Sequence, residues 1–277
     1  MIDIILSNNY IFLIILMIIA AIPVGFCAGL FGIGGGLISV PFLFFIFDTV
    51  ILDKEYLMHL SVGTAFSITI MTSSASVLTH RKHDAVDFNL LKTFGLFVGI
   101  GVIFGTLLAS FLNTKTLVLF FSLIVYFFGA YLLLIQENKK KIKRKFNSLA
   151  KVILGFFSGF ISAPMGITGA MINVPILKYF GYGIKRAIGT AASIGFIISL
   201  FGAVGFFTSG TLMKVNLPLS IGFINIPAFL IFVPITTIMA RVGANTVHSM
   251  DKIKIQRFFG IFLYIIGTIF VYRFLNL

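Results

Sequence analysis

The sequence predicts an all-α membrane protein, a polytopic helical bundle of two homologous halves. Three observations lead to this prediction. Hydrophobic residues make up 59% of the 277 residues and charged residues only 10%, whereas a soluble domain carries about 25% charged residues. Several apolar runs reach the length of about 20 residues that a membrane-crossing helix needs. A glycine-rich motif also returns once in altered form, which indicates an internal duplication.

The duplication consists of two pairs of matching segments. The first pair is GLFGIGGGLISVP at 29–41 and GITGAMINVP at 166–175. The second pair is SVGTAFS at 61–67 and AIGTAAS at 187–193. These matches divide the chain into two transmembrane repeats joined by a basic cytoplasmic linker, at 1–135, 136–147 and 148–277.

Two glycines upstream of the first motif also have counterparts in the second half. Gly25 and Gly29 align with Gly155 and Gly159, and this alignment places four extra residues before the second glycine-rich motif. Gly101 lies in an ordinary apolar run, so we expect it to be a helix-packing glycine with no part in a site.

The apolar runs of the two halves correspond in order and length. Those of the first half are 4–30, 34–47, 57–79, 89–112 and 116–135. Those of the second half are 148–163, 168–181, 186–208, 217–240 and 256–275. The second run of each half has about fourteen residues, too few to cross about 30 Å of hydrocarbon. Each glycine-rich motif therefore either interrupts one span, which gives parallel repeats, or turns a re-entrant hairpin, which gives inverted repeats.

The distribution of positive charge favours the inverted arrangement. Basic residues of short loops stay on the cytoplasmic side. With the linker inside, the inverted arrangement leaves outside only four of the 21 Lys and Arg: Lys54, Lys115, Lys214 and Arg273. The parallel arrangement would leave nine of them outside, among them Lys178, Arg186 and the basic residues of the Arg241–Arg257 loop. We therefore expect inverted repeats, with the N-terminus outside.

The glycine-rich motifs are expected to break their helices and to form a binding site. Glycine and proline both disfavour a continuous helix. Unpaired backbone groups inside a membrane are tolerated only against protein or a polar cavity, and paired breaks in duplicated halves are typical of transporter binding sites. Helix-packing glycines are the alternative. A P-loop is excluded, because no Lys-Ser/Thr pair follows the glycines.

The chemistry of such breaks indicates an anion. The second arm of a broken helix begins with free N–H groups at the positive end of the helix dipole. Nearby hydroxyl and amide side chains add donors, although each could instead bond its own helix backbone. The candidate binding residues are Gly32, Gly34, Gly35, Gly36, Ser39, Thr64, Ser67, Gly166, Thr168, Gly169, Asn173, Thr190 and Ser193.

Other classes of site find no support. All eight acidic residues lie near termini or loops, so no carboxylate at the membrane centre indicates cation transport. The sequence shows neither the spacing of a metal site nor a catalytic arrangement, so we expect no metal, no cofactor and no enzyme. The basic residues lie in short loops, which does not indicate nucleic-acid binding. Arg241 and His80 are alternatives for anion pairing and proton coupling, but loop and interfacial positions explain both.

These motifs resemble the TauE/SafE (sulfite exporter) family. The resemblance rests on the pattern at Gly25–Pro41, its echo at Gly155–Pro175, and the Gly-Thr-Ala motifs at Gly63 and Gly189. It implies a permease in the inner membrane of a prokaryote, with a small anion such as sulfite or a sulfonate as substrate. Thr168 departs from the pattern, because it stands where the first copy has a glycine.

We therefore expect an anion permease that works by alternating access. A passive anion channel and an accessory subunit without transport activity are the alternatives. Membrane lipids are the expected surroundings, and a second copy of the chain is left open as a partner.

Overall fold

The computed structural model describes residues 2–31, 34–51, 54–134, 146–246 and 252–277. The prediction of an all-α polytopic bundle is confirmed, because the described chain is almost entirely helical. In the first half the elements are α1 (Ile2–Phe31), α2 (Gly36–Val50), α3 (Leu57–Lys82), α4 (Phe88–Leu90), a π-helical turn (Leu91–Gly95), α5 (Leu96–Phe111) and α6 (Thr114–Leu134).

The second half repeats this order. Its elements are α7 (Ser148–Ser162), a 3-10 turn (Ala163–Met165), α8 (Ala170–Tyr179), α9 (Ile184–Leu212), β1 (Ser220–Ile221), β2 (Ile224–Asn225), α10 (Ile226–Thr246) and α11 (Lys252–Asn276). Eight stretches of the described chain are long and apolar enough to cross a membrane. The helices after the breaks, α2 with 15 residues and α8 with 10, are too short, as predicted. The apolar run 217–240 is not helical throughout, because β1 and β2 form a small hairpin before α10.

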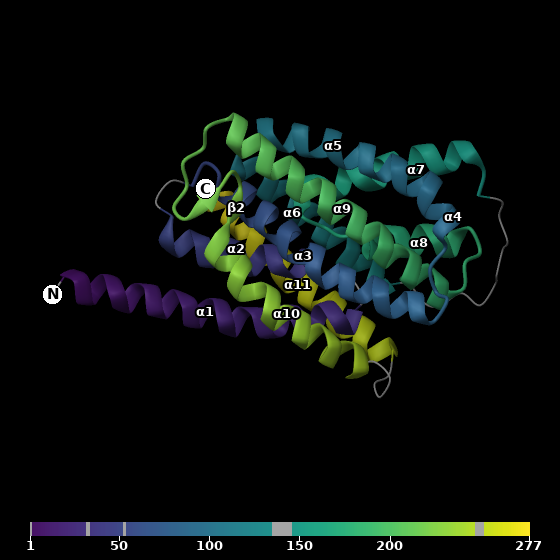
Figure 1. Cartoon of the computed structure of the whole chain (residues 1–277), viewed down its shortest axis with the longest axis horizontal. Helices are drawn as coiled ribbons and strands as arrows, with labels where there is room; N and C mark the ends of the chain where they lie inside the picture. Colours follow the sequence, from purple (N-terminus) through teal and green to yellow (C-terminus); the bar gives the residue numbers. More distant parts are fainter. Residues whose placement is uncertain (1, 32–33, 52–53, 135–145, 247–251) are drawn as a thin grey trace.

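The helices pair between the halves. α1 packs along α10 and α7 along α5, at opposite edges of the bundle, while α3 packs on α9 and α6 on α11 (Figure 1). The last two pairs join counterparts, and each pair runs antiparallel. On α3, Gly63 approaches Phe206 and Phe66 covers Gly202. On α6, Phe121 contacts Phe270, near the end of α11.

The structure agrees with the alignment of the upstream glycines. A Cβ on Gly29 would lie 1.9 Å from the carbonyl oxygen of Ala240 on α10, and one on Gly159 would lie 2.0 Å from the carbonyl oxygen of Val98 on α5. Gly29 therefore corresponds to Gly159. The four extra residues of the second half fall where the 3-10 turn at Ala163–Met165 precedes the second break.

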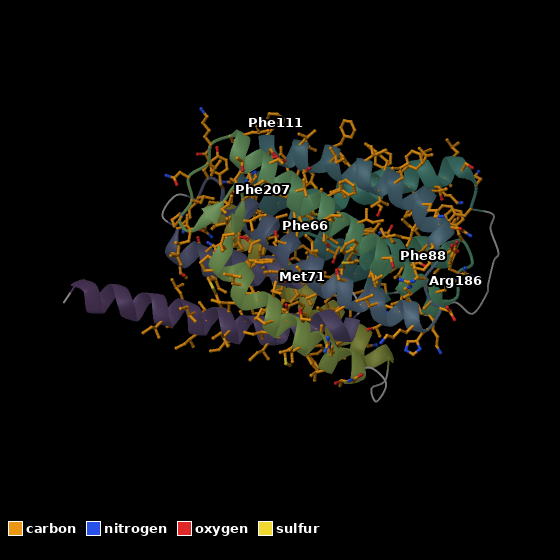
Figure 2. The ribbon with its side chains drawn as sticks, viewed as in Figure 1. Phe66, Met71, Phe88, Phe111, Arg186 and Phe207 are labelled. Atoms are coloured by element: carbon orange, nitrogen blue, oxygen red, sulfur yellow. The ribbon has the colours of Figure 1, made fainter. Side chains whose placement is uncertain are left out.

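The two ends of the bundle are identified by the contacts found there. Phe146, at the end of the linker, stacks on Phe180 just after α8, and we call this end the linker end. Figure 2 shows Arg186 and Phe88 near this end and Phe111 near the other. At the opposite end Asp48 pairs with Lys54 at 2.8 Å and with Arg273 at 2.9 Å.

Candidate functional site

The two breaks are in contact with each other. A Cβ on Gly34 would lie 2.9 Å from the hydroxyl oxygen of Thr168, and one on Gly36 would lie 2.2 Å from the carbonyl oxygen of Gly166. No side chain fits at this distance, so the backbones meet only because position 36 is a glycine. The prediction that the breaks approach one another is confirmed.

Left-handed glycines reverse the chain at each break. Gly34 and Gly35 have φ angles of 72° and 93°, and Gly166 has a φ of 65°. Residues with a Cβ rarely adopt such positive φ angles, whereas glycine adopts them at little cost. The chain then returns along the bundle, so α1 and α2 form a hairpin instead of one interrupted span.

The breaks meet beside the middle of α3 and α9. The hydroxyl of Thr72 donates to the carbonyl oxygen of Gly34 at 2.8 Å. On the other side, a Cβ on Gly169 would lie 2.4 Å from the backbone nitrogen of Gly195 and 2.5 Å from the carbonyl oxygen of Ala191. The breaks are therefore held between the two long helices that cross the centre of the bundle.

A small cavity lies where these elements converge. Its volume is about 10 Å³, which is about the room that one water molecule needs. Its lining residues are Gly34, Ser73, Ser76, Thr168, Gly169, Ala170, Ala191, Ala192 and Gly195. Within the described part of the chain, none of these walls carries a charged side chain. A larger ligand would require the walls to move.

Two helix N-termini begin at this point without side-chain caps. The N-cap residues of α2 and α8 are Gly35 and Gly169, which have no side chain to offer. The first N–H groups of a helix have no partner within the helix. Ser39 and Asn173 hold the same place in the two helices, and each donates to the carbonyl oxygen of its N-cap glycine, at 2.9 Å and 2.8 Å.

Ser162 lies opposite the start of α8 and has an unsatisfied hydroxyl. One turn earlier on α7, Ser158 donates to the side-chain oxygen of Asn173 at 2.8 Å, so this face of α7 points at α8. Ser162 is completely buried, and its Oγ has no hydrogen-bond partner. A buried hydroxyl without a partner costs about 1–3 kcal/mol.

Four predicted binding residues are not brought to the breaks. Thr64 accepts a hydrogen bond from the backbone N–H of Asn225 at 2.9 Å, and Thr190 accepts one from Asp87 at 3.0 Å. These bonds join α3 and α9 to the loops that precede α10 and α4. Ser67 and Ser193 donate to carbonyl oxygens of their own helices. Ser67 and Ser193 therefore bond the backbone of their own helices, which was the alternative to anion binding. Gly32, another predicted binding residue, lies outside the described residues.

Sequence reasoning missed Ser73, Ser76 and Ser162. The first two belong to the polar run TSSAS at 72–76, which stands out in the middle of an apolar segment and could have marked this face of α3. Ser162 carried no such signal, because a serine near a helix end is common. Only the folded structure shows that its hydroxyl is unsatisfied and that Asn173 of α8 bonds Ser158, one turn earlier on α7.

Charged groups cluster at the linker end instead. Asp87 accepts hydrogen bonds from Tyr182 at 3.2 Å and from Arg186 at 3.1 Å. Burial, followed by the negative charge of Asp87, raises the pKa of Tyr182 to about 12, so the phenol remains a donor. Arg241 is exposed on α10, which agrees with anchoring at the membrane surface and not with anion pairing.

Comparison with known proteins agrees with this architecture. The family model described as sulfite exporter TauE/SafE matches residues 16–270. The chain belongs to the TauE/SafE family. Its relatives include probable membrane transporter proteins from Haemophilus influenzae, 27% identical over 92% of this chain and 97% of the relative, and from Methanocaldococcus jannaschii, 28% identical over 82% and 83%. No solved structure matches the chain.

Membership of the TauE/SafE family makes this chain a multi-pass membrane transporter. A third relative, the probable membrane transporter protein YunE of Bacillus subtilis, is 25% identical over 94% of this chain and 97% of its own length. The matched region contains both breaks, both Gly-Thr-Ala motifs and the helices from α2 to α10, with part of α1 and most of α11. The centre of the architecture described above therefore belongs to the family match.

Proposed function

We propose that this TauE/SafE protein is a permease of a prokaryotic inner membrane that carries small sulfur-containing or related organic anions, of the sulfite or sulfonate type. One observation carries the proposal: two uncapped helix N-termini meet at the centre of the bundle. Each N-terminus offers free N–H groups and the positive end of a dipole. The unsatisfied hydroxyl of Ser162 supplies a further donor beside the start of α8.

Alternating access is the mechanism that we infer. The cavity between the breaks has room for only about one water molecule, which supports an occluded carrier over a channel with a continuous polar path. Opening toward either side requires the α1–α2 or the α7–α8 hairpin to move against α3 and α9. Rocking of one repeat against the other is the usual form of such movement.

We further propose that the repeats 1–135 and 148–277 are inverted. The antiparallel course of α3 against α9 and of α6 against α11 supports this, because a two-fold axis in the membrane plane reverses the direction of each counterpart. The charge distribution supports the same orientation, with the linker end in the cytoplasm and Asp48 outside.

Counterflow in proteoliposomes tests the proposed function. Vesicles loaded with sulfite or methanesulfonate should take up the labelled anion in a saturable manner, and internal anion should accelerate uptake. Non-saturable flux without counterflow would indicate a channel. Absence of flux with every anion, in protein that remains folded, would indicate the accessory role.

Replacement of two hydroxyls should weaken binding to different extents. Ser162→Ala removes a donor to a charged ligand. We expect a loss of about 1.5–3 kcal/mol, or roughly 10- to 150-fold in affinity. Thr168→Val should cost about 1 kcal/mol, roughly fivefold. The measurement is the concentration of sulfite or methanesulfonate that half-saturates uptake.

Ser61→Ala is the matched control for Ser162→Ala. Ser61 is equally buried, but it donates to the carbonyl oxygen of Leu57, away from the breaks. The affinity of the Ser61→Ala variant for the anion should remain that of the wild type. Equal losses in the two variants would remove Ser162 from the site.

Cysteine labelling should reveal the orientation of the bundle. In a Cys27→Ala background, a cysteine at Lys54 should react with an impermeant reagent added outside. Cysteines at Ile184 and Lys252 should react only after the membrane is opened, because the charge distribution puts both in the cytoplasm. Labelling of Ile184 or Lys252 in intact cells would support parallel repeats instead.

A further inference from the structure

We propose that the site selects anions with a single negative charge and rejects dianions of the same size. An alkanesulfonate or hydrogensulfite would be carried, whereas sulfate or a doubly ionised phosphonate would not. This inference rests on the proposed function, because it concerns the anion that binds at the two breaks.

The positive charge available at the site is the first argument. The N-terminus of a helix acts as about half an elementary charge, so α2 and α8 together supply about one. The cavity walls consist of glycine, alanine, serine and threonine, whose donors stabilise an anion without adding net charge. Two half charges compensate the single charge of a monoanion, but they leave one of the two charges of a dianion uncompensated.

The charged and titratable side chains of the surrounding helices are the second argument. In the described parts of α2, α3, α8 and α9, all of them lie in the terminal turns: Asp48, His59, His80, Arg81, Lys82, Lys178, Tyr179, Lys185 and Arg186. The two arginines are engaged elsewhere. The guanidinium of Arg81 lies over the ring of Phe88, and that of Arg186 pairs with Asp87. None of these side chains lines the cavity.

The balance between attraction and desolvation decides the preference. The attraction of an anion to fixed dipoles grows in proportion to its charge. The Born cost of moving an ion out of water grows with the square of the charge, so a dianion loses about four times as much as a monoanion of equal radius. With no cation to offset this difference, the site favours the monoanion.

Two isosteric anions test the inference. Methanesulfonate remains a monoanion across neutral pH, whereas methylphosphonate changes there from monoanion to dianion. We expect methylphosphonate to inhibit methanesulfonate counterflow at pH values below its second pKa. Above that pKa its inhibition constant should rise by about tenfold for each pH unit, as the monoanion fraction falls. The half-saturation constant of methanesulfonate itself should change less than threefold over the same range.

A cation placed at the cavity should relax this selection. Ser76 lines the cavity and is partly exposed, so a lysine there can extend toward water. We expect Ser76→Lys to lower the inhibition constant of doubly ionised methylphosphonate at least tenfold relative to the neutral control Ser76→Gln. Wild-type inhibition that is as strong with the dianion as with the monoanion would overturn the inference. If folded wild-type protein showed no methanesulfonate counterflow, that result would instead overturn the proposed function as a whole.

Discussion

Gly36→Ala is expected to reduce transport by roughly 100-fold while the protein remains inserted and folded. A Cβ at this position would lie 2.2 Å from the carbonyl oxygen of Gly166, so the two breaks would have to separate by about 1 Å. Displacements of this size can cost about 100-fold where groups must converge on a ligand. Gly36 is the first residue of α2 and its φ is not positive, so alanine fits the local backbone. The variant therefore tests the contact alone.

Gly183→Ala is the matched control for Gly36→Ala. Gly183 precedes α9, and a Cβ there would meet nothing within 4 Å. The transport rate and melting temperature of the Gly183→Ala variant should equal those of the wild type. Gly101 would not serve as this control, because a Cβ there would lie 2.0 Å from the carbonyl oxygen of Phe156. Normal transport by Gly36→Ala would show that the breaks need not touch.

A different result is expected at the Gly-Thr-Ala motifs, where substitution should destabilise the fold. Cβ atoms on Gly63 and Gly189 would lie 2.2 Å and 2.4 Å from the carbonyl oxygens of Phe223 and Ala85. Valine at either position should push the loop away and weaken the hydrogen bond to the neighbouring threonine. We expect a loss of about 3 kcal/mol, or a melting temperature lower by roughly 6–12 °C.

Thermal unfolding in detergent measures this effect, and Gly183→Val serves as its control. The folded fraction of Gly63→Val and Gly189→Val should bind the anion with nearly unchanged affinity, because these glycines contact the loops and not the breaks. Weakened anion binding at an unchanged melting temperature would return the Gly-Thr-Ala motifs to the binding site.

The pseudo-symmetry of these contacts agrees with the pairing that sequence comparison gave. The Gly-Thr-Ala motifs were correctly paired, because both copies keep the same residues. Gly29 was correctly paired with Gly159, because each glycine lets its helix approach a carbonyl oxygen of the neighbouring helix, on α10 and on α5. Sequence comparison found this register because glycine is needed wherever two helix backbones come so close.

The sequence by itself determined the membrane class, the number of apolar segments and the positions of both breaks. Each of these depends on residues near one another in the chain: on about 20 consecutive apolar residues, or on a run of glycines that no helix tolerates. Only the tertiary structure decided which polar groups serve the breaks. Thr64 bonds Asn225, which is 161 residues away, and Ser162 is left without a partner beside α8. Such partners depend on how separate helices pack, which local sequence does not encode.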